Sequence, residues 1–313
     1  MVKIKDMKER ERYDIPLLVK ECRNGTTSKG APYLNLVLQD SSGTIDAKYW
    51  DVKPADLEVV KTGRIVQFAF DVLLYNGSLQ LRVARASAID ENQVKLEEYL
   101  ISAAQPEEAR RRSLDEYLGS IRNENYRKLV TGLLELIGDR YFSYPAASRI
   151  HHSYLGGLSE HSLSMASMAE DICRHYPQLN HDLLISGALI HDIGKTAEMS
   201  GAVSTEYTLE GKLEGHISLA NGWLTEVAAR LDLDDTEECI LLHHMILSHH
   251  GHYEFGSPVL PMVMEAEVLS LIDNLDARMN TITHALESTP AGGWTSKLFA
   301  LENRQFYKPK KAQ

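Results

Sequence analysis

The sequence predicts an α+β protein of two domains, a five-stranded β-barrel followed by an all-helical bundle. Apolar residues alternate with the period of strands up to about residue 90, and recur with the period of helices from about residue 116. All 13 histidines fall between His151 and His284. We therefore expect a first domain at 1–90, a linker and connecting helix at 91–115, a second domain at 116–300, and an unstructured polar tail at 301–313.

The first domain contains five strand candidates. In the second of them Leu34, Leu36 and Leu38 share one face, which we expect to form the core. Asn76-Gly77 predicts a hairpin turn between the last two strands. The predicted strands are 15–22, 33–39, 44–50, 64–74 and 78–84, with a short helix at 54–60. Five strands with a helix between the third and fourth are the elements of an OB-fold barrel, in their usual order.

Polar and aromatic side chains are predicted to face outward from neighbouring strands of this barrel: Tyr33, Asn35, Lys48, Trp50 and Arg82. Residues 1–90 hold 14 basic and 12 acidic residues, so the net charge of −11 comes from the rest of the chain. OB barrels bind single strands by stacking bases on aromatic rings along such a face. The alternative is that Trp50 covers the open end of the barrel and the charges are ordinary surface.

The second domain is predicted to be a bundle of helices. Leu129, Leu133 and Ile137 recur at helical spacing, and Pro106 suits the first turn of the connecting helix. The predicted bundle helices are 126–137, 158–175, 182–193, 217–231, 237–248 and 265–286. Residues 201–211 depart from this period and predict a small hairpin or loop.

Histidine and aspartate residues on several separate helices predict a divalent-metal site. Asp192 follows His191 among apolar neighbours, where an unpaired carboxylate would be costly to bury unless a cation compensates it. Imidazole nitrogens and carboxylate oxygens bind borderline and hard cations, and one aspartate can bridge two ions. Two ions about 3.5–4 Å apart form a phosphodiester-cleaving centre. The predicted ligands are His161, His191, Asp192, His216, His249 and Asp273, with His250 ranked below His249.

Gly194 and Lys195, which follow the His191-Asp192 pair, are also predicted to have roles at the site. We expect Gly194 to let the chain leave the helix. Lys195 then stands near the ions as a catalytic residue beside Asp192, where its ammonium group contacts a phosphate oxygen. The alternative is that Lys195 only compensates the dipole at a helix C-terminus.

Five of the remaining histidines are interpreted as structural residues and not as metal ligands. A lone histidine on an apolar helix face is more often a hydrogen-bonded core residue than a ligand, and we apply this to five residues: His175, His181, His243, His244 and His284. His151 and His152 line the substrate path or belong to the surface, and the sequence leaves that choice open.

The sequence also predicts the protein's surroundings. Its apolar runs are too short to span a membrane, and its charged N-terminus is followed by no signal-peptide core. Cys22, Cys173 and Cys239 are far apart, which is typical of free thiols in a reducing compartment. We expect a cytoplasmic protein without a membrane partner.

The ligand pattern resembles a known superfamily. His161, His191-Asp192 and Asp273 match the positions that define the HD phosphohydrolases, and His216 and His249 match the extra ligands of the two-metal members. Longer stretches resemble the YhaM family of bacterial 3′→5′ exoribonucleases: 156–161, 214–216, 246–251, 254–258 and 273–277. The resemblance covers nearly the whole chain, including the order of the two domains.

This resemblance implies an OB fold joined to an HD domain. It also implies manganese-dependent removal of nucleotides from the 3′ end of single-stranded RNA, releasing nucleoside 5′-monophosphates, with some activity on single-stranded DNA. The residues alone predict only a metal-dependent phosphohydrolase, whose ligands suit Co, Fe, Ni, Mg or Zn as well as Mn. We hypothesise that Asp192 bridges two ions and that the strand is threaded from the barrel to them.

Two other functions stay open at this point. One is an HD nucleotidase or cyclic-nucleotide phosphodiesterase that acts on small molecules. The other is a single-strand-binding protein whose metal site is a relic, although a relic has no reason to keep six ligand-type residues. The native metal, the preference for RNA over DNA and the existence of a homo-oligomer are not decided by the sequence.

Overall fold

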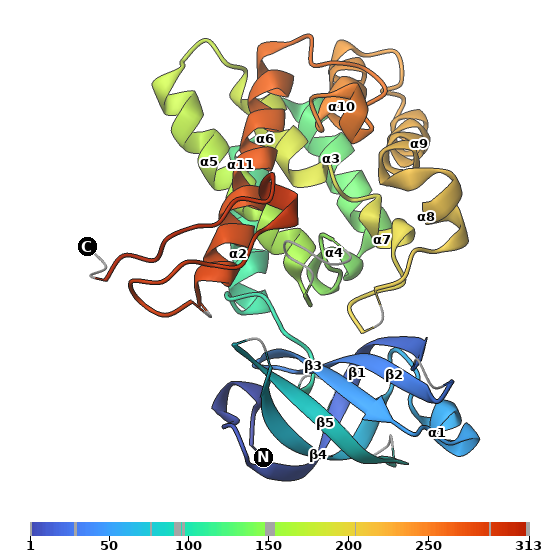
Figure 1. Ribbon diagram of the computed structural model, residues 1–313. Coiled ribbons are helices and arrows are strands. Elements are labelled where there is room, and N and C mark those ends of the chain that lie inside the picture. The colour runs from blue at the N-terminus through green and yellow to red at the C-terminus, as the bar shows by residue number, and fades with distance from the viewer. Residues whose placement is uncertain are drawn as a thin grey trace. The chain divides into compact units, whose positions relative to one another are not determined.

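The computed structural model describes residues 2–27, 30–75, 77–90, 95, 98–147, 154–203, 205–287 and 289–310. The chain divides into two compact units, Met1–Ser102 and Ala103–Gln313. Strands make up the first unit and helices the second (Figure 1). Among the described residues, the helices are all too short or too polar to cross a membrane.

The first unit is a closed barrel of five strands, which confirms the predicted architecture (Figure 1). The strands pair in the order β1-β2-β3-β5-β4, and only the β3–β5 pair is parallel. The elements are β1 (Arg12–Thr26), β2 (Pro32–Asp40), β3 (Gly43–Trp50), α1 (Pro54–Val59), β4 (Ile65–Tyr75) and β5 (Ser78–Ala88), after a 3₁₀ turn η1 (Ile4–Asp6).

The barrel interior is filled by the predicted apolar faces. Leu34, Leu36 and Leu38 of β2 are buried, together with Phe68 of β4 and Leu81 of β5. Side chains fill the interior of a small barrel in this way, so it is a packed core rather than a pore. Asn76 of the predicted hairpin lies outside the described residues.

The second unit is a helical bundle, and the six predicted bundle helices are confirmed with ends shifted by up to three residues. Its helices are α2 (Glu107–Ser120), α3 (Glu124–Ile137), α4 (Arg140–Ser143), α5 (Gly157–His175), α6 (His181–Ile190), α7 (Lys195–Glu198), α8 (Leu209–Leu213), α9 (Gly215–Arg230), α10 (Glu237–Ser248) and α11 (Met264–Glu287). Pro106 stands just before α2 rather than in its first turn.

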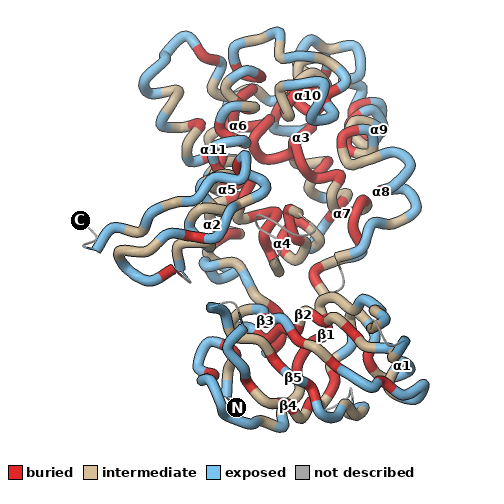
Figure 2. Tube along the Cα trace, in the orientation of Figure 1, coloured by how far each residue is buried: buried red, intermediate tan, exposed pale blue. Residues whose placement is uncertain are grey.

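Helix α6 is the centre of this bundle. Every residue from 183 to 190 is buried, and α6 packs against α3, α5, α10 and α11. Figure 2 shows this buried centre, with the exposed residues on the outer helices and loops. A helix that is apolar all round belongs inside a protein, so α6 is the element on which the others are assembled.

One segment agrees with the sequence-based expectation and another differs from it. Residues 201–208 form the predicted loop, closed by a bridge between Met199 and Tyr207 and followed by α8; Ser204 lies outside the described residues. Residues 289–310, which we name the C-terminal arm, are structured instead of forming a free tail. Bridges join Trp294 to Tyr307 and Leu298 to Arg304, and they enclose a 3₁₀ turn, η5 (Phe299–Leu301). Buried Leu301 anchors the arm, which periodicity alone does not reveal.

Candidate metal centre

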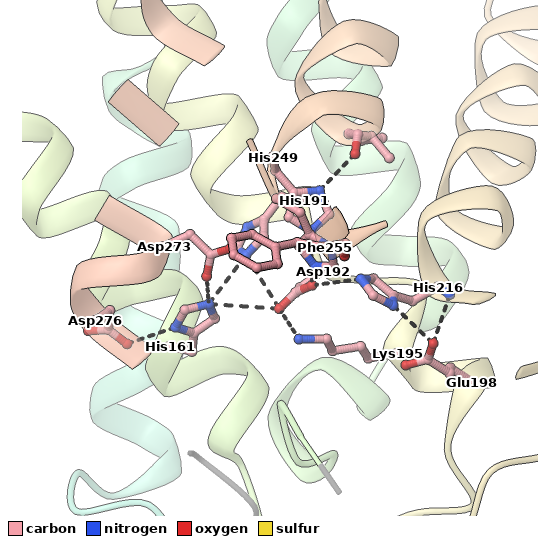
Figure 3. Close-up of polar contacts among 12 residues, drawn as sticks. His161, His191, Asp192, Lys195, Glu198, His216, His249, Phe255, Asp273 and Asp276 are labelled. Atoms are coloured by element: carbon pink, nitrogen blue, oxygen red, sulfur yellow. Dashed lines mark hydrogen bonds and ion pairs between the residues drawn. The ribbon is translucent and has the colours of Figure 1, made fainter. Parts of the chain in front are cut away.

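The second unit brings all the predicted metal ligands to one place (Figure 3). They come from separate segments of the chain, and all except Asp273 lie at or near the end of a helix. His161 lies on α5, His191-Asp192 follow α6, His216 lies in the first turn of α9, His249-His250 follow α10, and Asp273 lies on α11.

The turn after α6 differs from the prediction, since the helix ends at Ile190 and residues 191–194 form turns. Gly194 adopts ordinary right-handed angles, φ −59° and ψ −21°, and directly precedes α7, so it is not where the chain leaves helix α6. Its role is steric. A Cβ at this position would lie 2.0 Å from the backbone oxygen of His216. Glycine therefore lets the turn that holds Asp192 touch the first turn of α9.

Asp192 lies between two groups of ligand atoms. Its Oδ2 is 3.7 Å from Nε2 of His161 and 3.4 Å from Nε2 of His191. Its Oδ1 is 3.5 Å from Nε2 of His216 and 3.6 Å from Nε2 of His249. Each carboxylate oxygen therefore faces its own pair of imidazole nitrogens.

Each of the two groups has the composition of an ion site. Ligand atoms of His161, His191 and Asp273 lie within 4.8 Å of one another, as do those of His216, His249 and His250. In the first group, Nε2 of His161 is 3.2 Å from Oδ1 of Asp273. With one oxygen of Asp192 added, each group offers four nitrogen or oxygen atoms, and His250 belongs to the second.

Every imidazole in the two groups is oriented through its Nδ1. In each case Nδ1–H donates to an oxygen, which leaves Nε2 directed at the centre. The acceptors are Oδ2 of Asp276 for His161 (2.7 Å), the carbonyl of Ala188 for His191 (3.1 Å), Oε1 of Glu198 for His216 (3.0 Å), the carbonyl of Ile246 for His249 (2.7 Å) and the carbonyl of Phe255 for His250 (2.6 Å).

Unsatisfied polar atoms at the centre show that divalent cations suit this site. Oδ1 of Asp192 and Nε2 of His216 and His249 are buried and have no hydrogen-bond partner among the described residues. Buried polar atoms almost always have partners, because leaving them without one costs free energy. Cations between these atoms would satisfy all three, and their atom types are those that borderline divalent cations bind.

Neighbouring charges shift the pKa values of the ionisable side chains in the centre. Burial lowers the pKa of His161, but its contacts with Asp273 and Asp276 more than offset this and raise the pKa to about 10. Burial opposes the charge of Asp192, yet Lys195 and His191 hold its pKa well below the usual range. Asp192 is therefore ionised, and a cation that binds Nε2 of His161 must displace a proton.

Lys195 lies where the sequence places it. Its Nζ is 2.5 Å from Oδ2 of Asp192, and its side chain is only 12% exposed. It lines a pocket of about 750 Å³ together with His216, His250 and Asp273. The lysine begins the short helix α7, so it can present a positive charge to whatever enters this pocket.

Sequence reasoning missed two carboxylates that hold the ligands in place. Oε1 of Glu198 accepts both the backbone N–H and the Nδ1–H of His216. Asp276 accepts from His161, and also from Oγ of Ser164 at 2.5 Å. Asp276 could have been found, because it lies three residues after Asp273 and hence on the same face of α11. Glu198 has no comparable signal in the sequence.

Where the structure describes them, the other histidines are not metal ligands, but the expectation that they are core residues is wrong, because His175 and His284 are exposed and the remaining three are only half-buried. Nδ1 of His243 contacts Asn221, Nε2 of His244 accepts the backbone N–H of Met262, and His181 is paired with carboxylates. Among the described residues, the two ligand groups contain none of the five histidines: His175, His181, His243, His244 and His284. His151 and His152 lie outside the described residues.

The predicted nucleic-acid face forms a cluster on the outside of the barrel. Tyr33 and Trp50 are partners across β2 and β3, and their rings stack with centres 4.7 Å apart. Lys48 contacts the side-chain oxygen of Asn35, and its Nζ lies 5.4 Å from the centre of the Tyr33 ring. Arg82 neighbours Lys48 on β5 and forms an ion pair with Asp71. Trp50 is 44% exposed and is not part of the barrel core.

Comparisons with known proteins agree with this geometry. Residues 158–278 match the model of the HD domain family. The chain is 43% identical over 300 residues to a 3′-5′ exoribonuclease YhaM of Geobacillus sp. (strain WCH70), covering 96% of this chain and 92% of the relative. It is also 43% identical to a 3′-5′ exoribonuclease YhaM of Bacillus pumilus (strain SAFR-032), covering 96% and 95%.

Among solved structures, the second OB-fold domain of replication protein A from Methanococcus maripaludis is similar to part of the chain. It is 23% identical, with a TM-score of 0.25, and covers 30% of this chain and 98% of that domain.

Replacing Gly194 by alanine tests the steric role of this glycine. The added Cβ would meet the backbone of His216, so we expect a stability loss of about 1–3 kcal/mol and weaker metal binding. Thermal unfolding and bound metal per chain, measured by mass spectrometry, are the readouts. Gly222→Ala is the control, because a Cβ at that position of α9 meets no atom within 4 Å. Wild-type stability and metal content in Gly194→Ala would contradict the account.

Proposed function

The chain belongs to the YhaM family of 3′-5′ exoribonucleases, and from this membership and the geometry of its metal centre we propose how it works. It is a metal-dependent 3′→5′ exoribonuclease with an HD domain, a hydrolase that acts on phosphodiester bonds. The observation behind the proposed mechanism is the position of Asp192, whose two oxygens face two separate groups of ligand atoms.

Our proposal assigns two divalent ions to this centre. His161, His191 and Asp273 would hold one ion, His216, His249 and His250 would hold the other, and Asp192 would bridge them. Two such ions supply an activated water and polarise the scissile phosphate. We propose manganese as the native metal, although Co, Fe, Ni, Mg and Zn suit the same ligand atoms.

The chain's own residues prepare this centre and bind the substrate. Glu198 and Asp276 hold His216 and His161 in fixed orientations, so the ligands need no rearrangement. Lys195 keeps its positive charge, because Asp192 raises its pKa against the effect of burial. Its ammonium group, which contacts Oδ2 of Asp192, would also neutralise a non-bridging phosphate oxygen in the transition state.

The proposed substrate is single-stranded RNA, with single-stranded DNA as a second substrate and nucleoside 5′-monophosphates as products. The cluster of Tyr33, Trp50, Lys48 and Asn35 supports this, since it joins two stacked rings to a cation and an amide on the outer face of the barrel. Arg82 adds a positive charge to this face, although its guanidinium group forms an ion pair with Asp71. All three cysteines are free thiols, which supports a cytoplasmic location.

A gel assay tests the proposed function directly. We expect the manganese-loaded protein to shorten a 5′-labelled RNA of about 20 nucleotides in a ladder from its 3′ end, and a chelator to stop it. Asp192→Ala removes the residue shared by both ion sites, so we expect no turnover but normal RNA affinity.

The matched control is Asp171→Ala, which removes an exposed aspartate from α5 and should leave activity unchanged. Near-normal shortening by Asp192→Ala would refute the two-ion proposal. If the wild type leaves RNA intact but hydrolyses mononucleotides, the result would favour a small-nucleotide phosphohydrolase instead.

Replacing Trp50 by alanine tests the barrel face. If a base stacks on the Trp50 ring, the variant should bind RNA about 1–3 kcal/mol more weakly. Fluorescence anisotropy with a labelled single strand measures this. Tyr75→Ala is the control, since it removes a 62% exposed aromatic from the end of β4. Equal affinity in the Trp50 variant and the wild type would reduce Trp50 to an ordinary surface residue.

A further inference from the structure

The pocket beside the metal centre extends beyond the ligands and has a further wall. Its volume of about 750 Å³ lies within the range of about 300–1,000 Å³ that small-molecule sites occupy. Its lining includes three of the predicted ligands, His216, His250 and Asp273, and three residues of the C-terminal arm, Phe299, Leu301 and Glu302. The pocket therefore has space for a group the size of a nucleoside next to the proposed reaction centre.

Three exposed aromatic rings line this pocket. Phe255 is 59% exposed, Phe299 is 86% exposed and Tyr207 is 47% exposed. One exposed aromatic needs no explanation, but three around a single pocket form an apolar lining that water does not favour. Aromatic rings at a nucleic-acid site stack on bases, and such stacking accepts every base because each has a π face. This tolerance suits an enzyme that must remove each nucleotide in turn.

Phe255 is the ring most closely tied to the metal ligands. Its carbonyl accepts the Nδ1–H of His250 at 2.6 Å, so the backbone of Phe255 and a ligand of the second group are joined. The ring of His252 lies nearly perpendicular to the Phe255 ring, with centres 5.3 Å apart. Figure 3 shows the Phe255 ring in the same close-up as Asp273, Asp192 and His216. These contacts hold the ring at a set position relative to the centre.

The C-terminal arm forms part of the pocket wall. Arg278 on α11 forms ion pairs with Glu302 at 3.2 and 3.3 Å, which fastens the arm to the helix that also provides Asp273. Bridges within the arm keep Phe299 in its turn. A pocket bounded by this wall suits the 3′-terminal nucleotide of an RNA strand. A 3′→5′ exoribonuclease must hold that nucleotide.

We propose that this pocket holds the 3′-terminal nucleoside of the substrate, with the ring of Phe255 stacking on its base. The proposal rests on the exoribonuclease function and adds a binding residue to it. Phe255 positions the terminal nucleotide so that its phosphodiester lies at the two-ion centre. The substitution Phe255→Ala removes the ring but leaves the backbone carbonyl that His250 contacts.

The test compares two RNA substrates that differ only in whether the 3′-terminal nucleotide has a base or is abasic. For Phe255→Ala we expect kcat/KM on normal RNA to fall about 5- to 100-fold, the loss of one stacked base, with no further fall on abasic RNA. The wild type should lose a similar factor between the two substrates. Phe255→Trp keeps a stacking face and should restore the preference for a base.

The control is Tyr253→Ala, which removes a 62% exposed ring from the same 3₁₀ turn, η4 (Tyr253–Phe255), but not from the pocket lining. All variants must bind as much manganese as the wild type. If Phe255→Ala loses activity equally on both substrates, the ring has no base to stack on and the proposal is refuted. If the wild type shortens neither RNA, the exoribonuclease function itself fails.

Discussion

The structure of the helical unit depends on one constraint, the burial of an ionised carboxylate. Asp192 is 2% exposed and keeps its negative charge. A buried anion is stable only if positive charge or hydrogen-bond donors surround it on every side. Lys195 provides one such contact to Oδ2, but within the described part of the chain Oδ1 has no hydrogen-bond partner and faces two imidazole nitrogens. Two divalent cations would complete this environment, and they would also provide the chemistry of phosphodiester hydrolysis.

The fold meets this constraint by delivering polar groups at the ends of apolar elements. Helix α6 is buried along its length and releases His191-Asp192 only where it ends, so the core is not interrupted by the ligands. Helices α9 and α10 each present ligands at a terminus. Gly194 allows the turn that holds Asp192 to contact the backbone of His216 in α9. The Nδ1 donors then fix each ring through a carbonyl or carboxylate, which prepares the centre before any ion or substrate binds.

Local patterns in the sequence predict the strands, the helices and the six ligands, because alternation, helical periodicity and buried polar residues are properties of neighbouring positions. They do not predict contacts between distant segments. The support of His216 by Glu198, the contact between Gly194 and the backbone of His216, and the folding of the C-terminal arm beside the pocket arise from tertiary packing. The sequence also predicts that helix α6 extends to Ile193, because the apolar pattern continues that far, whereas the helix ends at Ile190 and the chain turns to present Asp192.

The most direct test of the account is a crystal structure of the manganese-loaded protein with anomalous diffraction data collected at the manganese edge. We predict two anomalous peaks about 3.5–4 Å apart on either side of the Asp192 carboxylate. One should lie among His161, His191 and Asp273, and the other among His216, His249 and His250. A single peak in fully loaded crystals, or two peaks that Asp192 does not bridge, would contradict the central claim.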